Sequence, residues 1–164
     1  MRELAHLDWT EILERLAKFA TCELSRGTLR ELEPLTSAAE AEASFREIFE
    51  LIDLLKGGRR PHAESLDLFS LWFQRLTKQA TLKTLELKDI RHFCLELIAL
   101  KEIFKTFRTP WISQIEQGVM NAEEPLSAID QLMTPEGDIR NDASETLFSL
   151  FNEKNQLVRQ IQSI

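Results

Sequence analysis

Hydrophobic side chains recur at three- and four-residue intervals along most of the chain, which is the spacing of amphipathic α-helices. The first run predicts a helix from Asp8 or Thr10 to Phe19, and a second helical stretch ends before Pro34. The next helix has the clearest start, because Ser37 and Glu40 have capping-box spacing, and glycines 57 and 58 supply its end. Its expected apolar face is formed by Ala41, Phe45, Ile48, Ile52 and Leu55.

The middle of the chain continues the helical pattern. An aromatic run predicts a helix over 68–76, and a longer helix is predicted over about 85–107. Apolar residues cover more than one face of the longer helix, so we expect it to be central. A shorter helix is predicted from Trp111 to Val119, and Pro125 is expected to open a last connection.

The stretch from Met133 to Ser144 precedes the last helix. Pro135 to Asp138 has the composition of a tight turn, so a short β-hairpin is expected near residues 132–140. Asp142 and Ser144 are both candidate N-caps, and Glu145 stands at capping-box distance from Asp142. An apolar helix-packing seam then repeats to the end of the chain at Leu147, Phe151, Leu157, Val158, Ile161 and Ile164.

No Gly, Asn or Pro closes the last helix, so we expect a helix severed from a longer one. The predicted fold is all-α, mainly a helical bundle with one short hairpin. We divide it into a helical core domain, residues 1–143, and the start of a lever-type helix, residues 144–164.

Composition favours an ordinary helical protein, with 43% hydrophobic residues, 29% charged residues, five Gly and five Pro. No apolar run approaches the roughly 20 residues that cross a bilayer, and the N-terminus does not begin a signal peptide. Cys22 and Cys94 lie inside helical patterns and are expected to be buried thiols rather than a disulfide. These observations predict a cytoplasmic protein without a membrane partner.

Charge is uneven along the chain. The net charge is −7, but the segment from Arg59 to Arg108 holds ten basic and six acidic residues, so it carries +4 and the flanks carry −11. This segment is interpreted either as a surface for phosphates or an acidic partner, or as a solvated face that balances the acidic flanks. The residues of the candidate basic surface are Arg59, Arg60, Arg75, Lys78, Lys83 and Lys88.

A search for chemistry finds no catalytic, cofactor-binding or metal-binding constellation. Gly57-Gly58 follows Lys56 and matches no phosphate loop. His6, His62 and His92 lie far apart, and no Cys/His cluster has metal-ligand spacing. No Ser has the setting of a nucleophile elbow. We therefore predict that this chain is not itself an enzyme and holds no cofactor.

Three motifs occur in order along the chain. The first is Leu7-Asp8-Trp9-Thr10-Glu11-Ile12-Leu13, and the second is Gly27 followed by Leu32-Glu33-Pro34-Leu35-Thr36 and the capped helix. The third is Gly137-Asp138-Ile139-Arg140-Asn141-Asp142-Ala143-Ser144-Glu145-Thr146-Leu147. Together they resemble the N-terminal region of the second bacterial MutS branch, the paralogues linked to suppression of recombination. The third motif matches that family's Gly-x-Ile/Val-x-Asp-x-Ala-Ser-x-x-Leu, with Asn141 in place of Asp, and the Gly expected around Gln79 is missing.

The resemblance implies that this chain is the front of a modular homodimeric ATPase. ATP and Mg²⁺ would bind to domains further along, and many members end in a small nuclease domain. Members act on DNA recombination intermediates or split stalled ribosomes, through domains other than this one. The segment resembles the non-catalytic helical core and lever portion.

Two other functions remain open. A free-standing helical adaptor would use the seam from Leu147 to Ile164 to dock onto a partner or a second copy. A direct nucleic-acid binder would use the basic middle of the chain.

Overall fold

A computed structural model describes residues 8–162, and within this range the fold is all-α, as predicted. No strand occurs among the described residues. The helices are α1 (Trp9–Ala17), α2 (Glu23–Arg30), α3 (Ala38–Lys56), α4 (Leu66–Thr77), α5 (Thr84–Lys105), α6 (Pro110–Gly118), α7 (Glu123–Leu132) and α8 (Glu145–Gln162).

Most helix ends follow local sequence signals. The Ser37 hydroxyl accepts a hydrogen bond from the Glu40 amide at 3.2 Å, and α3 ends at Gly57 as expected. The expected connection after Pro125 is wrong, because Pro125 lies inside the first turn of α7. A proline is tolerated there because the first amides of a helix have no intrahelical acceptor.

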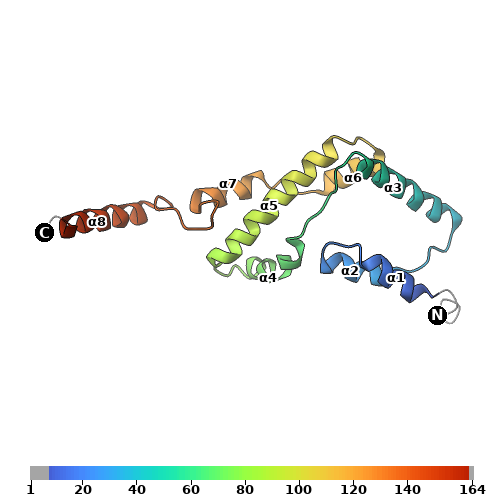
Figure 1. The fold of residues 1–164 in the computed structure, drawn as a ribbon, viewed down its shortest axis with the longest axis horizontal. Helices are drawn as coiled ribbons and strands as arrows, with labels where there is room; N and C mark the ends of the chain where they lie inside the picture. The colour runs from blue at the N-terminus through green and yellow to red at the C-terminus, as the bar shows by residue number, and fades with distance from the viewer. Residues whose placement is uncertain (1–7, 163–164) are drawn as a thin grey trace.

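Helix α5 is the central element, as its apolar pattern predicted. It packs against α4, α6 and α7, while α1 packs on α2, α2 on α4 and α3 on α6. Figure 1 shows an elongated molecule in which α3 and α8 lie toward opposite ends of the long axis. None of the other described helices packs on α8.

Two separate hydrophobic cores form along α5. The larger core gathers around Trp72 of α4 and Phe93 of α5, and includes Ile90, Cys94, Ala122, Ile129 and Met133. The smaller core joins α3, α5 and α6 through Leu54, Phe104 and Ile112. A 22-residue helix is about 33 Å long, so one helix has room for a core toward each end.

Two carboxylates join helices by capping their first turns from a neighbouring element. Glu50 of α3 accepts from the amides of Trp111 and Ile112 at 3.2 and 3.3 Å, at the start of α6. Glu96 of α5 accepts from the amides that precede α4, at 3.1 Å. Both carboxylates satisfy helix-terminal donors, so they have a structural role.

The expected apolar face of α3 does not pack into the described body. Leu54, on the opposite side of the helix, is fully buried against α6, whereas Phe45 is 59% exposed and Phe49 is 62% exposed. Ile48, Ile52 and Leu55 are exposed as well. The helix therefore turns its smaller apolar side inward and leaves its larger apolar side free.

The two cysteines are buried and free, as predicted, and burial raises the pKa of the Cys94 thiol. Gln79 lies where the resemblance described above leads us to expect a Gly. It follows α4, and its φ of 52° is in the left-handed region. Within the described range, no helix combines the length and apolarity needed to span a membrane.

Candidate functional site: the junction between the helical body and α8

The segment from Met133 to Ser144, called the junction below, connects the body of the protein to α8. Met133 is 1% exposed and belongs to the larger core beside Ile90 and Ile129. The junction therefore begins at a residue held firmly in the body. Because α8 packs on none of the other described helices, the junction is the connection that holds α8 to the body among the described residues.

The turn of the junction is tight, and the expected hairpin is reduced to a single antiparallel bridge between Met133 and Ile139. The Thr134 amide donates to the Asp138 carbonyl at 2.8 Å, and the Arg140 amide donates to the Leu132 carbonyl at 2.9 Å. Gly137 has a φ of 101°, which a residue with a Cβ adopts only under strain. A two-residue pairing is too short to count as a strand.

Side chains of α5 and α7 reinforce the start of the junction. The Lys88 ammonium donates to the Glu136 carbonyl at 3.4 Å, and its Cδ lies 3.0 Å from the place that a Cβ on Gly137 would occupy. Arg91 of α5 pairs with Asp130 of α7 at 2.6 Å. A bond to Thr134 lowers the pKa of Glu136. The tight turn of the junction therefore contacts Lys88, which lies in the second turn of α5.

The end of the junction contains a local ion pair and a helix cap. Arg140 donates two hydrogen bonds to Asp142, both at 2.9 Å, and this pairing raises the pKa of Arg140 and lowers that of Asp142. Helix α8 begins at Glu145, so the cap position falls on Ser144 and the Asp142–Glu145 capping box is not formed. Ser144 is the cap, since its hydroxyl accepts from the Leu147 amide at 3.1 Å.

The predicted seam of α8 lies mostly in solvent. Leu147 and Phe151 are half-buried, whereas Leu157 is 52% exposed and Ile161 is 71% exposed. Val158 is exposed too, and Ile164 lies outside the described residues. Two further apolar residues of α8, Phe148 and Leu150, are also exposed.

The structure separates the six residues of the candidate basic surface into two groups. Arg59 donates to Thr106 at the C-terminal end of α5, at 2.7 Å, and Arg60 donates to the Phe19 carbonyl at 3.4 Å. Arg75 is paired with Glu86 in the first turn of α5 at 2.7 Å. Lys83 is the N-cap residue of α5, and Lys88 lies in the second turn of that helix. Lys78 is the C-cap residue of α4, which precedes α5 in the chain.

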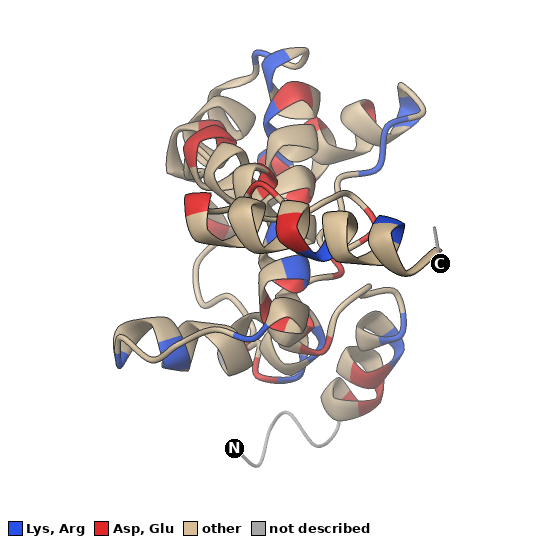
Figure 2. Ribbon diagram, turned by 90° about the vertical axis from the view of Figure 1, so that its left-hand side faces the viewer, with Lys and Arg blue, Asp and Glu red and all other residues tan. Residues whose placement is uncertain are grey.

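The two groups are thus separated by most of the roughly 33 Å length of α5. Figure 2 shows basic and acidic residues interspersed along the ribbon. Nucleic-acid binding by these residues stays a prediction. Support for it would be salt-sensitive binding that weakens when Arg59, Arg60 and Lys78 are neutralised.

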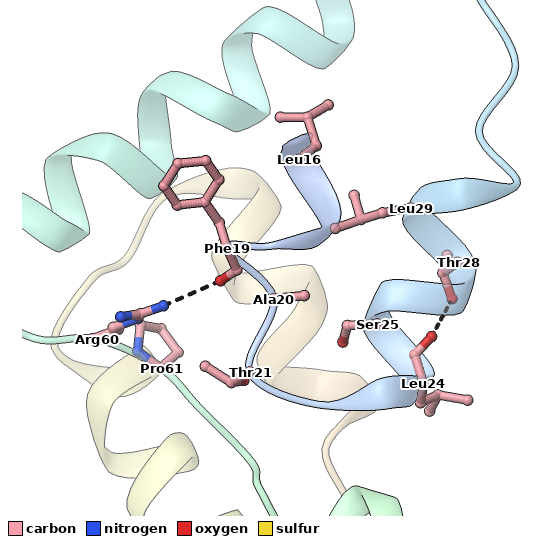
Figure 3. A pocket seen from close by; sticks show the side chains of 10 residues that line it. All are labelled: Leu16, Phe19, Ala20, Thr21, Leu24, Ser25, Thr28, Leu29, Arg60 and Pro61. Carbon is pink, nitrogen blue, oxygen red and sulfur yellow. Dashed lines mark hydrogen bonds between the residues drawn. The ribbon is translucent and has the colours of Figure 1, made fainter. Parts of the chain in front are cut away.

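A groove beside α1 and α2 has a volume of about 570 Å³ and is lined mainly by apolar side chains, including Leu16, Phe19 and Leu29 (Figure 3). Three of its polar side chains are engaged within the chain: Arg60 donates to the Phe19 carbonyl, the Thr28 hydroxyl donates to the Leu24 carbonyl at 3.0 Å, and the Ser25 hydroxyl bonds to the Cys22 thiol. Among the described residues, no three His, Cys, Asp or Glu side chains gather as a metal site. The groove offers contact surface rather than a reactive group.

Comparison with known proteins gives two distant relatives. The Endonuclease MutS2 of Solidesulfovibrio magneticus is 23% identical over 163 residues, covering 93% of this chain and 20% of that protein. The Endonuclease MutS2 of Clostridium beijerinckii is 24% identical over 172 residues, covering 97% of this chain and 21% of that protein. No family model and no solved structure matches the chain.

The chain therefore spans about a fifth of the length of the curated relatives that it matches. The alignments extend over nearly the whole chain. They support a MutS-related origin for this sequence.

Proposed function

We propose that this chain is the N-terminal helical core of a larger MutS2-like ATPase, and that α8 begins its lever. The observation that carries the proposal is the position of α8, which leaves the body at the junction and packs on none of the other described helices. Similarity over most of this chain to one fifth of two MutS2 endonucleases agrees with a segment of a longer protein. The segment itself is non-catalytic.

The junction would transmit motion between the body and the lever. Met133 is anchored in the larger core, and the residues from Asn141 to Ser144 connect that anchor to a capped helix. A helix of 18 residues is about 27 Å long. A rotation of about 5° at the junction would therefore displace its far end by about 2 Å.

The parent protein is proposed to be a cytoplasmic homodimer that binds ATP and Mg²⁺ through downstream domains. DNA or ribosomes would be gripped by other parts of the same polypeptide, in suppression of recombination or in rescue of stalled ribosomes. A downstream nuclease domain is consistent with the names of the relatives.

The first test is the reading frame beyond the codon for Ile164. A Walker motif downstream is expected, and a stop codon directly after Ile164 would refute the proposal. The isolated chain is expected to hydrolyse neither ATP nor nucleic acid, and turnover above a buffer control would contradict its non-catalytic role.

A second test interrupts the lever in the parent protein. Asn152→Pro places a proline in the middle of α8, where it removes a helical hydrogen bond and kinks the helix. ATP hydrolysis is expected to persist, while the effect of ATP on DNA or ribosome binding is lost. Asn152→Ala is the matched control, and equal loss in both variants would argue against a rigid lever.

The second candidate function is a free-standing helical adaptor, and the exposed seam of α8 favours it. An adaptor would be encoded by a frame that stops at Ile164, and it would bind its partner through the seam without any nucleotide. The reading frame therefore separates the two candidates.

A further inference from the structure

Two helices of this chain expose apolar faces of the same pattern. On α3 the face comprises Phe45, Ile48, Phe49, Ile52 and Leu55. On α8, residues Leu147, Leu150, Phe151 and Leu157 each lie 102 positions after an apolar residue of the α3 face. This spacing forms a continuous stripe along one side of a helix and suits pairing with a second helix.

The two faces of one molecule are not placed to meet each other. Helices α3 and α8 lie toward opposite ends of the long axis (Figure 1), and no contact joins them. A partner for each face must therefore come from another segment or another molecule.

Charge favours pairing α3 with α8 over pairing each helix with its own copy. Lys154 interrupts the α8 stripe at the position where α3 has Ile52, so parallel pairing of two α8 helices would set Lys154 against Lys154. Helix α3 carries five acidic and two basic residues, so two α3 helices would repel. Glu42 flanks the α3 stripe and offers a carboxylate to Lys154 or Arg159 of α8, and Asp53, which pairs with Lys56 of its own helix at 2.9 Å, flanks the stripe as well.

We propose that α8 of one chain packs on α3 of a second copy, and that the reciprocal contact closes a symmetric dimer of this 164-residue chain. With two equal contacts, both apolar faces of each molecule are covered, so the assembly closes at two copies. Each contact would cover nine large apolar side chains, of which seven are 38–62% exposed and two, Leu147 and Phe151, are half-buried. At about 70 Å² each, the two contacts cover roughly 1,300 Å², which lies within the range of stable specific interfaces.

The test is sedimentation of the purified chain over a range of concentrations. The wild type is expected to reach twice the mass of one chain. The double variant Phe45→Glu/Phe49→Glu and the double variant Leu150→Glu/Leu157→Glu should each raise the dimer dissociation constant on the order of 30-fold or more, because each places charges in an apolar contact. Leu71→Glu/Leu85→Glu, two equally exposed positions away from both faces, is the matched control and should remain dimeric.

Mixing the two double variants distinguishes helix exchange from self-pairing. The α3 variant keeps an intact α8 and the α8 variant keeps an intact α3, so together they should form a heterodimer through one contact. A monomeric wild type would overturn the proposal, and so would an α3 variant that dimerises as well as the wild type. Circular dichroism of each variant checks that helix content is retained, which is expected because all four positions are exposed.

Discussion

At the scale of single residues, the junction depends on backbone conformation and on short polar contacts rather than on reactive groups. Gly137 occupies a φ of 101°, and a Cβ added to it would lie 3.0 Å from Cδ of Lys88. Gln79 occupies a φ of 52° without being a glycine. Replacing the glycine at position 137 should therefore lower the stability of the protein, whereas introducing a glycine at position 79 should raise it.

Replacing Gly137 by Ala is expected to destabilise the protein by about 1–3 kcal/mol, because the new Cβ strains the backbone and displaces Lys88. The converse change, Gln79→Gly, relieves a left-handed residue and should stabilise by about 0.5–1 kcal/mol after the extra entropy of glycine. Urea denaturation measures both. Equal effects of the same sign would contradict the role assigned to the two backbone conformations.

The ion pair in the junction predicts a pH dependence. The hydrogen bonds from Arg140 lower the pKa of Asp142 in the folded state, so their stabilisation is present above the unfolded pKa and is lost as pH falls through the folded pKa. An NMR titration of the Asp142 carboxyl should show a midpoint below the ordinary value for Asp. Arg140→Gln should return it toward that value, while the distant Arg108→Gln should leave it unchanged.

At the scale of helices, local signals decide where each helix begins, and packing decides which face is covered. Ser37 and Ser144 both cap their helices as their sequence settings indicate. Asp142, the other candidate cap, bonds instead to Arg140, two residues before it in sequence. For α8, which has no packing partner among the described helices, the cap is a large part of what holds the first turn.

Ser144→Ala is expected to loosen α8 alone. Loss of the cap costs the helix about 1 kcal/mol, which should speed amide hydrogen exchange in its first two turns. In the monomeric Phe45→Glu/Phe49→Glu background, the denaturation midpoint of the body should stay unchanged, since within one chain α8 packs on none of the other described helices. Ser149→Ala, at an exposed position in the second turn of the same helix, is the control and should slow exchange slightly because Ala favours helix. A lower midpoint in Ser144→Ala would mean that α8 supports the body.

At the scale of the whole molecule, the body is a series of pairwise helix contacts with a core toward each end of α5. The smaller core has three buried residues and joins α3 and α6 to the rest. The larger core holds α4, α5, α7 and the start of the junction. This arrangement predicts that the α3–α6 end opens before the other end.

Ile112→Ala tests whether the α3–α6 end opens before the end that holds the larger core. Ile112 is 1% exposed in the smaller core, and its truncation costs about 2–5 kcal/mol. Hydrogen exchange should lose protection in α3 and α6 while α4, α7 and the N-terminal half of α5 keep theirs. Ile161→Ala, at a 71% exposed position, serves as the control and should change stability by less than about 0.5 kcal/mol. Uniform loss of protection would indicate a single cooperative core instead.

The sequence by itself determined the all-α class, the approximate limits of most helices and the central place of α5, because helical periodicity, capping residues and Pro or Gly breaks act within a few neighbouring residues. Tertiary structure alone decided that Leu54 rather than Phe45 faces inward and that Arg59 and Arg75 lie at different ends of α5. These outcomes depend on which segments meet in space. A periodic stripe specifies that a face is apolar, but the partner that covers it lies elsewhere in the chain or in another molecule.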